Sequence, residues 1–349
     1  MIRVLVESIS DIDSAYYKYL LEYPPKGVLF LNKNKKLLIT SSRKFLSRLK
    51  IKRLFHKILK YSNLPKIKKA RKHFNVDLYH SSHTFLITDK PYVIDFEHYW
   101  ILSYSSESAY GVIGKKLIKK LFLQKNLKYI LPWTYAAYNS IPKEIRSDKK
   151  IRDKIKVVYP AVPTNKYPRK KYNKLKIIFT SRYFMLKGEH IIYKIYKILH
   201  MKYQDCVELI IVAPVPSNVS QKYNFIKFYD IMPQEDLFKL FEKAHIYIYP
   251  RYIDTFGFTI LEAMSFGMPV IASDGFARRE LITDNETGFI IPRSKNEIEH
   301  YIDKISELIE NPSLLKSMSR RAFKEIKYGK FSIRRRNKVL KEVYESAIE

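Results

Sequence analysis

Short apolar runs alternate with helix-like stretches along the second half of the chain. The apolar runs are rich in β-branched residues, which is typical of strands that are buried on both faces of a parallel sheet. We expect such strands at residues 176–180, 207–212, 245–249 and 269–272. The segments between them repeat apolar positions with a helical period and predict helices at residues 189–200, 234–244, 259–266 and 295–310.

The first half of the chain has the same pattern in a less regular form. It predicts strands at residues 2–6, 27–31, 78–80, 92–94, 129–131 and 156–159. Three prolines within residues 160–173 predict a linker. The expected fold class is therefore α/β, with two Rossmann-like domains built on parallel doubly wound sheets. The ligand of such a pair is expected in the cleft between the domains, at the carboxyl ends of the strands.

Two carboxylates stand out in the second half, where the strand at 245–249 leads into the helix at 259–266. Asp254 precedes this helix and Glu262 lies within it. The start of a helix at a sheet's carboxyl edge presents backbone N–H groups and suits an anion. Because ionised carboxylates only accept hydrogen bonds, the pair suits a ligand rich in hydroxyls, such as a sugar or a ribose. The alternative is that Glu262 only caps or pairs within the fold, and the spacing does not decide between the two.

Two cations follow the predicted strand at 176–180 on a single loop. Arg182 and Lys187 lie at the same edge of the expected sheet, where they could clamp a diphosphate. With 65 Lys and Arg residues in the chain, a chance pair is the alternative.

Taken together, these segments resemble the retaining GT-B glycosyltransferases of the group 1 type, family four of the sugar-transferase classification. The match is carried by residues 250–274, with Asp254 and Glu262 as the family's acid-x7-acid signature, and it continues through Glu280 to Phe289. Arg182 and Lys187 fall where the family has its diphosphate-binding cations. The resemblance covers residues 156–349 well and the first half weakly.

The resemblance implies an enzyme that uses a nucleoside-diphosphate sugar as its substrate and needs neither a cofactor nor a metal. Glu262 would bind the ribose, while Asp254 with the backbone of Phe256 and Gly257 would hold the donor sugar. The leaving diphosphate would be neutralised by Arg182 and Lys187. The sequence Asp11-Ile12-Asp13 matches a metal motif of a different transferase fold, but an ordinary turn is the alternative there.

The resemblance also implies a division of labour between the two domains. Residues 1–165, with a C-terminal helix at 331–349 that crosses back, would form the acceptor-binding domain. Residues 170–330 would form the nucleotide-sugar-binding domain. His98 follows a predicted strand as a family histidine does, and it would face the donor sugar and help to position the acceptor. A structural histidine is the alternative.

The sequence departs from the family pattern near the donor sugar. Asp254 stands where the family has Glu, which shortens the reach by one methylene. Phe276 and Ala277 replace a glycine pair that precedes Glu280. We therefore expect activity to be retained with an unusual donor-sugar pocket.

Charge adds a hypothesis about the acceptor, because the chain has a net charge of +31. Residues 23–76 contain seventeen Lys and Arg residues and no acid. Within this basic arm, residues 43–61 predict a basic amphipathic helix, and residues 115–128 form a second basic stretch. Such segments indicate binding to an anionic membrane surface. Because the resemblance implies that the first domain binds the acceptor, we expect an acceptor that is membrane-bound or lipid-linked. The alternatives are a core helix with a solvated face, a DNA-modifying glycosyltransferase, and a non-catalytic protein that binds polyanions or nucleotide sugars.

The remaining features concern where the protein resides. Cys206 is the single cysteine, which excludes a disulfide framework. The first residues lack the pattern of a signal peptide, and no apolar run is long enough to span a bilayer. We expect a cytoplasmic protein that is at most peripheral on the inner face of a membrane.

Overall fold

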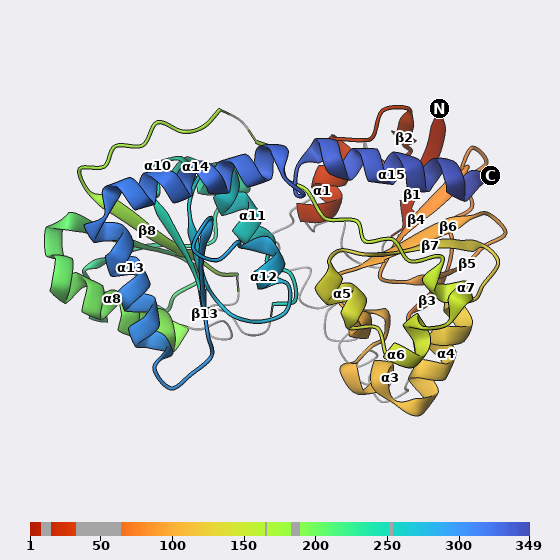
Figure 1. The fold of residues 1–349 in the computed structure, drawn as a ribbon, viewed down its shortest axis with the longest axis horizontal. Coiled ribbons are helices and arrows are strands. Elements are labelled where there is room, and N and C mark those ends of the chain that lie inside the picture. The colour runs from red at the N-terminus through yellow and green to blue at the C-terminus, as the bar shows by residue number, and fades with distance from the viewer. Residues whose placement is uncertain (8–14, 33–63, 165, 183–188, 251–253) are drawn as a thin grey trace. The chain divides into compact units, whose positions relative to one another are not determined.

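A computed structural model describes residues 1–7, 15–32, 64–164, 166–182, 189–250 and 254–349. The chain divides into two compact units (Figure 1). Unit 1 contains Met1–Ala161 and Ile333–Glu349, and unit 2 contains Val162–Ser332. Both units are built on parallel sheets, so the expected fold class is confirmed.

Unit 2 has a six-stranded sheet in the order β10-β9-β8-β11-β12-β13, and every neighbouring pair is parallel. The order reverses between β8 and β11, as in a doubly wound dinucleotide-binding sheet. The strands are β8 (Leu175–Thr180), β9 (Val207–Val212), β10 (Ile226–Tyr229), β11 (Ile246–Tyr249), β12 (Val270–Ser273) and β13 (Gly288–Ile291).

The helices of unit 2 cover this sheet and bury its β-branched strands (Figure 1). α8 packs against α13 and β9, while α11 packs against α14, β11 and β12. The helices are α8 (Glu189–Tyr203), α9 (Ser217–Lys222), α10 (Gln234–Lys243), α11 (Phe258–Ser265), α12 (Arg278–Leu281), α13 (Glu297–Glu310) and α14 (Pro312–Tyr328), with a 3-10 turn η3 (Gln204–Cys206).

Unit 1 has a five-stranded parallel sheet in the order β2-β1-β4-β6-β7, with a separate parallel pair β3-β5. This order reverses between β1 and β4, so unit 1 is a second doubly wound sheet. The strands are β1 (Ile2–Glu7), β2 (Val28–Phe30), β3 (Ile67–Lys69), β4 (Leu78–Ser82), β5 (Phe85–Ile87), β6 (Tyr92–Phe96) and β7 (Leu127–Pro132).

The helices of unit 1 lie on both faces of its sheet, with α1 and α15 on one face and α4 with several shorter helices on the other (Figure 1). The last helix of the chain, α15, contacts β4 and β7, which makes it part of this unit's core. The helices are α1 (Ala15–Glu22), η1 (Tyr99–Leu102), α3 (Ser106–Tyr110), α4 (Val112–Phe122), α5 (Tyr135–Asn139), α6 (Lys143–Arg146), α7 (Lys149–Arg152) and α15 (Ile333–Ile348).

One predicted strand is wrong. Residues 156–159 run beside β7, and the N–H groups of Lys156 and Val158 donate to Ile130 and Pro132 at 3.0 Å. They form no strand, because these two contacts at the edge of the sheet do not extend into a ladder before the proline-rich segment begins. The predicted helix at 43–61 lies outside the described residues.

Candidate functional site

The strand order of unit 2 indicates at which edge of its sheet a ligand is expected to bind. Ligands of doubly wound sheets bind outside the carboxyl ends of the two strands where the order reverses. In this unit those strands are β8 and β11. The chain continues from β8 to Arg182 and from β11 to the segment that contains Asp254. Both clusters that the sequence singled out therefore begin at this edge.

Asp254 is held by one side chain from β11 and one from α12. Tyr249, the last residue of β11, donates its hydroxyl to Asp254 Oδ2 at 2.5 Å. The guanidinium of Arg278, which lies beyond β12, donates to the backbone carbonyl of Asp254. The carboxylate and its backbone are thus fixed separately, which orients the side chain.

Gly257 is required by the way α11 begins. Its φ is +91°, and a Cβ at this position would lie 2.9 Å from the Tyr249 hydroxyl. The first turn closes when the Ile260 N–H donates to the Gly257 carbonyl at 2.9 Å. Only glycine combines the left-handed conformation with this close approach, so the residue lets α11 start directly beside Asp254.

Glu262 lies on α11 and is only 4% exposed. The side-chain amide of Gln234, the first residue of α10, donates to Glu262 Oε1 at 2.7 Å. A carboxylate at this depth needs such donors, because burying an ionised group without hydrogen bonds is costly. Gln234 is a partner that the sequence did not reveal, since it is 28 residues away on another helix.

Arg278 is a second residue that sequence reasoning missed. It is fully buried, and its Nη1 donates to the Gly275 carbonyl at 3.0 Å as well as to Asp254. Its guanidinium carbon lies 5.5 Å from the centre of the Tyr249 ring. Burial lowers the pKa of Arg278, while Tyr249 and Asp254 act to raise it. An arginine in a short polar helix gives no sequence signal of burial.

Fewer contacts define the other residues that the sequence predicted to bind the sugar donor. Phe256 is 2% exposed, and its ring lies 5.5 Å from that of Phe258. Arg182 is exposed directly after β8. Lys187 lies outside the described residues. The structure therefore brings Asp254, Phe256, Gly257 and Glu262 together on one loop and helix.

A buried polar network supports the end of β11 from behind. The Tyr301 hydroxyl donates to the Tyr249 carbonyl at 3.3 Å and shares a 2.9 Å hydrogen bond with Ser273. Ser273 also donates to Glu297 Oε1 at 2.6 Å. Burial raises the pKa of Glu297 to about 7.

Replacing Glu297 with Gln should remove one source of pH-dependent stability. Because folding raises the pKa of this carboxyl, its contribution to stability is complete below about pH 4.5 and is lost as pH rises through about 7. Glu297→Gln should match the wild type in urea unfolding at pH 4.5 and exceed it at pH 8, by up to about 3 kcal/mol. The same change at the exposed Glu299 is the control. Equal pH profiles of the wild type and Glu297→Gln would contradict the prediction.

In unit 1, His98 follows β6 and is half-buried. Its ring lies 4.0 Å from the ring of Trp100, and burial lowers its pKa to about 4. The imidazole is therefore neutral near pH 7, and it can donate one hydrogen bond and accept another without carrying a charge.

A different histidine in unit 1 is fully enclosed, and it fastens the last helix. His80 Nε2 lies 2.9 Å from Asp95 Oδ2, and His80 Nδ1 lies 2.6 Å from the hydroxyl of Tyr344 on α15. Tyr17 donates to Asp95 Oδ1 at 2.5 Å. Burial acts to raise the pKa of Asp95, but His80 and Tyr17 hold it below its usual value. This network explains why the C-terminal helix belongs to unit 1.

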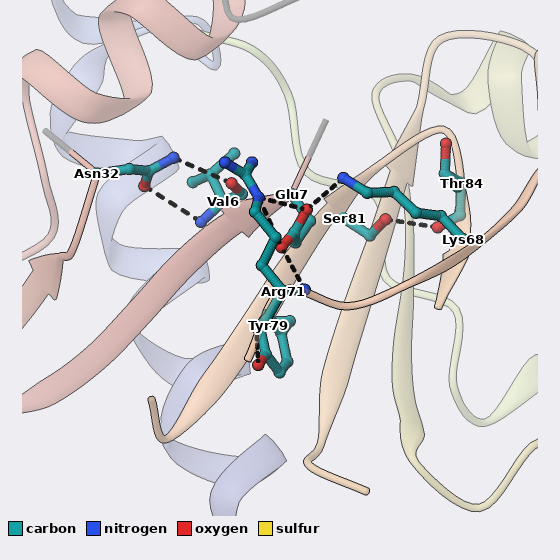
Figure 2. A network of polar contacts seen from close by, with 8 residues as sticks. All are labelled: Val6, Glu7, Asn32, Lys68, Arg71, Tyr79, Ser81 and Thr84. Carbon is teal, nitrogen blue, oxygen red and sulfur yellow. Dashed lines mark hydrogen bonds and ion pairs between the residues drawn. The ribbon is translucent and has the colours of Figure 1, made fainter. Parts of the chain in front are cut away.

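The carboxyl end of β1 carries a buried acid that engages part of the basic arm (Figure 2). The side chain of Glu7 is fully buried, and its oxygens lie 2.6 Å from Lys68 Nζ and 3.1 Å from Arg71 Nε. Burial acts to raise the pKa of Glu7, but these two cations hold it below its usual value. Lys68 and Arg71 therefore stabilise the fold instead of forming a purely solvated basic surface.

Residues 164–325 match the family described as "Glycosyl transferases group 1". The matched residues make up nearly all of unit 2. The resemblance inferred from the sequence is confirmed, and the matched residues include Arg182, Asp254 and Glu262.

Individual glycosyltransferases are similar to this chain over shorter lengths. An "Uncharacterized glycosyltransferase" of Haemophilus influenzae is 30% identical over 176 residues, which are 47% of this chain and 48% of that protein. The capsular polysaccharide biosynthesis glycosyltransferase CapM of Staphylococcus aureus is 25% identical over 46% of this chain and 45% of its own. The chain thus matches about half the length of these two relatives.

Solved structures share the fold over nearly the whole chain. The crystal structure of Anabaena Alr3699/HepE in complex with UDP has a TM-score of 0.66 and 15% identity, and the match covers 99% of this chain and 100% of that one. A glycosyltransferase from Rickettsia africae has a TM-score of 0.64 and 16% identity, with 99% and 98% covered. The GT-B fold therefore extends over both units.

Proposed function

We propose that the protein is a retaining, metal-independent glycosyltransferase that moves a sugar from a nucleoside-diphosphate sugar to an acceptor. The observation that carries the proposal is the pair of fixed carboxylates on the segment that follows β11, with Asp254 before α11 and Glu262 within it. The family match of residues 164–325 and the UDP complex of the Anabaena protein support a nucleotide-sugar donor.

Each residue of the site has a distinct part in this proposal. Glu262 accepts hydrogen bonds from the ribose hydroxyls, and Asp254, with the Phe256 and Gly257 backbone, holds the donor sugar. Arg182 and Lys187 stabilise the negative charge that develops on the diphosphate as the glycosidic bond breaks. His98 positions the acceptor.

Metal independence is part of the proposal because fixed cations can take the place of a metal at a leaving diphosphate. Among the residues that the structure describes, no group of three or more His, Cys, Asp and Glu side chains could hold a metal ion. Asp11 and Asp13 lie outside those residues.

NMR of sugar transfer or slow donor hydrolysis tests the proposal. The purified protein is incubated with UDP-, GDP- and ADP-sugars, with and without EDTA, and the anomeric proton of the released or transferred sugar is followed. We expect one nucleotide family to be consumed with retention and in the presence of EDTA. Inverted product or loss of turnover in EDTA would contradict the corresponding part of the proposal.

We further propose that the acceptor is lipid-linked and that unit 1 meets it at an anionic membrane surface. The basic stretch 115–128 is not a free apolar stripe, because Ile118 and Phe122 are fully buried in the core. The most exposed apolar side chains lie at the start of α4, before this stretch, where Val112 is 81% and Ile113 is 59% exposed. The exposed Lys116 and Lys120 follow on the same face of α4.

This arrangement supports membrane docking, because an apolar tip flanked by lysines suits the boundary between acyl chains and anionic headgroups. Nucleic acid would use the lysines but would gain little from Val112 and Ile113. No helix in the described part of the chain has the length and apolar character needed to cross a bilayer.

A double variant, Val112→Ser with Ile113→Ser, should weaken binding to phosphatidylglycerol vesicles about tenfold or more, because it removes apolar surface that the interface would bury. Vesicle sedimentation measures this loss. Ile198→Ser with Met201→Ser on α8 removes similar exposed side chains, which are 41% and 68% exposed, and should have no effect. Unchanged binding of the α4 variant would overturn the docking surface.

A further inference from the structure

Phe276 has a backbone conformation that a bulky residue rarely adopts. It lies in the loop between β12 and α12, and its φ is +46°. Glycine adopts this conformation without a steric penalty, whereas phenylalanine does not. The strain persists because the surrounding structure holds the loop, and strained residues of this kind cluster where a side chain serves a function.

The loop that contains Phe276 lies beside the segment that contains Asp254. β12 runs parallel to β11, with Ala272 paired to Tyr249, so the chain leaves both strands at the same edge of the sheet. Arg278 Nη1 then joins the two loops, since it donates both to the Gly275 carbonyl and to the Asp254 carbonyl. The residue before Phe276 is therefore tied to the backbone of the residue that would hold the donor sugar.

The Phe276 ring forms part of the surface at this place. It lies 5.7 Å from the guanidinium carbon of Arg278. Arg278 is 0% exposed whereas Phe276 is 36% exposed, so the ring is available to a ligand and the cation beneath it is not. An aromatic ring presents a large, rigid apolar face, which can pack against the C–H groups of a sugar ring.

We propose that Phe276 is a specificity-determining residue that lines the donor-sugar site and limits the size of the sugar it accepts. The inference rests on the proposed transferase function. It also gives a physical meaning to the place where the sequence departs from the glycine pair of the resembling family. A phenyl ring stands there in place of a glycine, and the guanidinium carbon of Arg278 lies 5.7 Å from the centre of that ring.

Phe276→Gly tests the inference, with Phe276→Asn as a second variant that tolerates positive φ. The measured quantity is the ratio of kcat/KM between two donors of one nucleoside. UDP-N-acetylglucosamine and UDP-glucose serve for uridine, and GDP-mannose and GDP-fucose serve for guanosine. We expect the ratio to move at least about tenfold toward the larger sugar, as for other single changes in a pocket wall. The Kd of the free nucleoside diphosphate should stay within about twofold, because Phe276 would contact only the sugar.

Gln204→Gly is the matched control, because Gln204 also has a positive φ, of +41°, but lies just before β9 at the opposite edge of the sheet. It removes the same kind of strain and should leave the donor ratio unchanged. Neither glycine variant should lower Tm. If the wild type is active and neither Phe276 substitution changes its donor ratio, the inference alone is overturned. A wild type that neither binds nor consumes any nucleotide sugar would overturn the proposed function as well.

Discussion

Replacing Glu262 with Gln should reduce kcat/KM for the sugar donor about 10²- to 10³-fold while leaving the fold intact. A carboxylate that accepts hydrogen bonds from two ribose hydroxyls makes two charge-assisted hydrogen bonds, and each contributes about 1.5–3 kcal/mol to binding. Because ribose is bound in both the ground state and the transition state, most of the loss should appear as a higher KM and a weaker nucleotide Kd. Initial rates and calorimetric binding measure the two effects.

Two further variants make the Glu262 result specific. Gln234→Ala removes the donor to Glu262 Oε1 and should cost about three- to tenfold in kcat/KM, because it disturbs the orientation of the carboxylate and leaves its charge in place. Glu286→Gln makes the same chemical change at an exposed loop position and should have no effect. Full activity of Glu262→Gln would remove the ribose assignment.

Replacing Arg182 with Ala should lower kcat about 10²- to 10³-fold. Arg182 follows the end of β8, at the edge where the sheet order reverses. A cation at this edge would stabilise negative charge that appears only as the diphosphate departs. We expect Lys187→Ala to act in the same direction, and both changes to weaken binding of UDP or GDP. Single-turnover rates and nucleotide titrations measure these losses.

The specificity of this effect can be checked with two substitutions. Arg182→Lys keeps the charge but loses the planar fork, and it should recover part of the activity. Lys194→Ala removes an exposed cation from α8, one of the many lysines of the surface, and should leave kcat unchanged. Nucleotide affinity that is equal in Arg182→Ala and the wild type would exclude the diphosphate role.

The donor half of the fold could be read from the sequence because local and global signals coincide there. The runs at β8, β9, β11 and β12 are buried almost throughout, and short apolar runs rich in β-branched residues indicate strands of a parallel sheet. β10 was missed because half of its positions are exposed, as in an edge strand, and β3 because it is short and basic.

The support of the site could not be read from the sequence, because it depends on pairs that are distant along the chain. Gln234 reaches Glu262 across 28 residues, and Arg278 reaches Asp254 across 24. Glu7 engages Lys68 and Arg71 more than sixty residues away. A charge count over the basic arm treats those lysines and arginines as surface, whereas the tertiary fold places a buried carboxylate between two of them.

Thermal unfolding with UDP, GDP and ADP, each with EDTA, tests most directly the claim that the carboxyl edge of unit 2 binds a nucleoside diphosphate without a metal. A ligand that binds only the folded protein raises Tm as its concentration rises. We predict that one nucleotide raises the Tm of the wild type in EDTA and that Glu262→Gln loses most of this shift. No shift with any nucleotide, or the same shift in Glu262→Gln, would contradict the account.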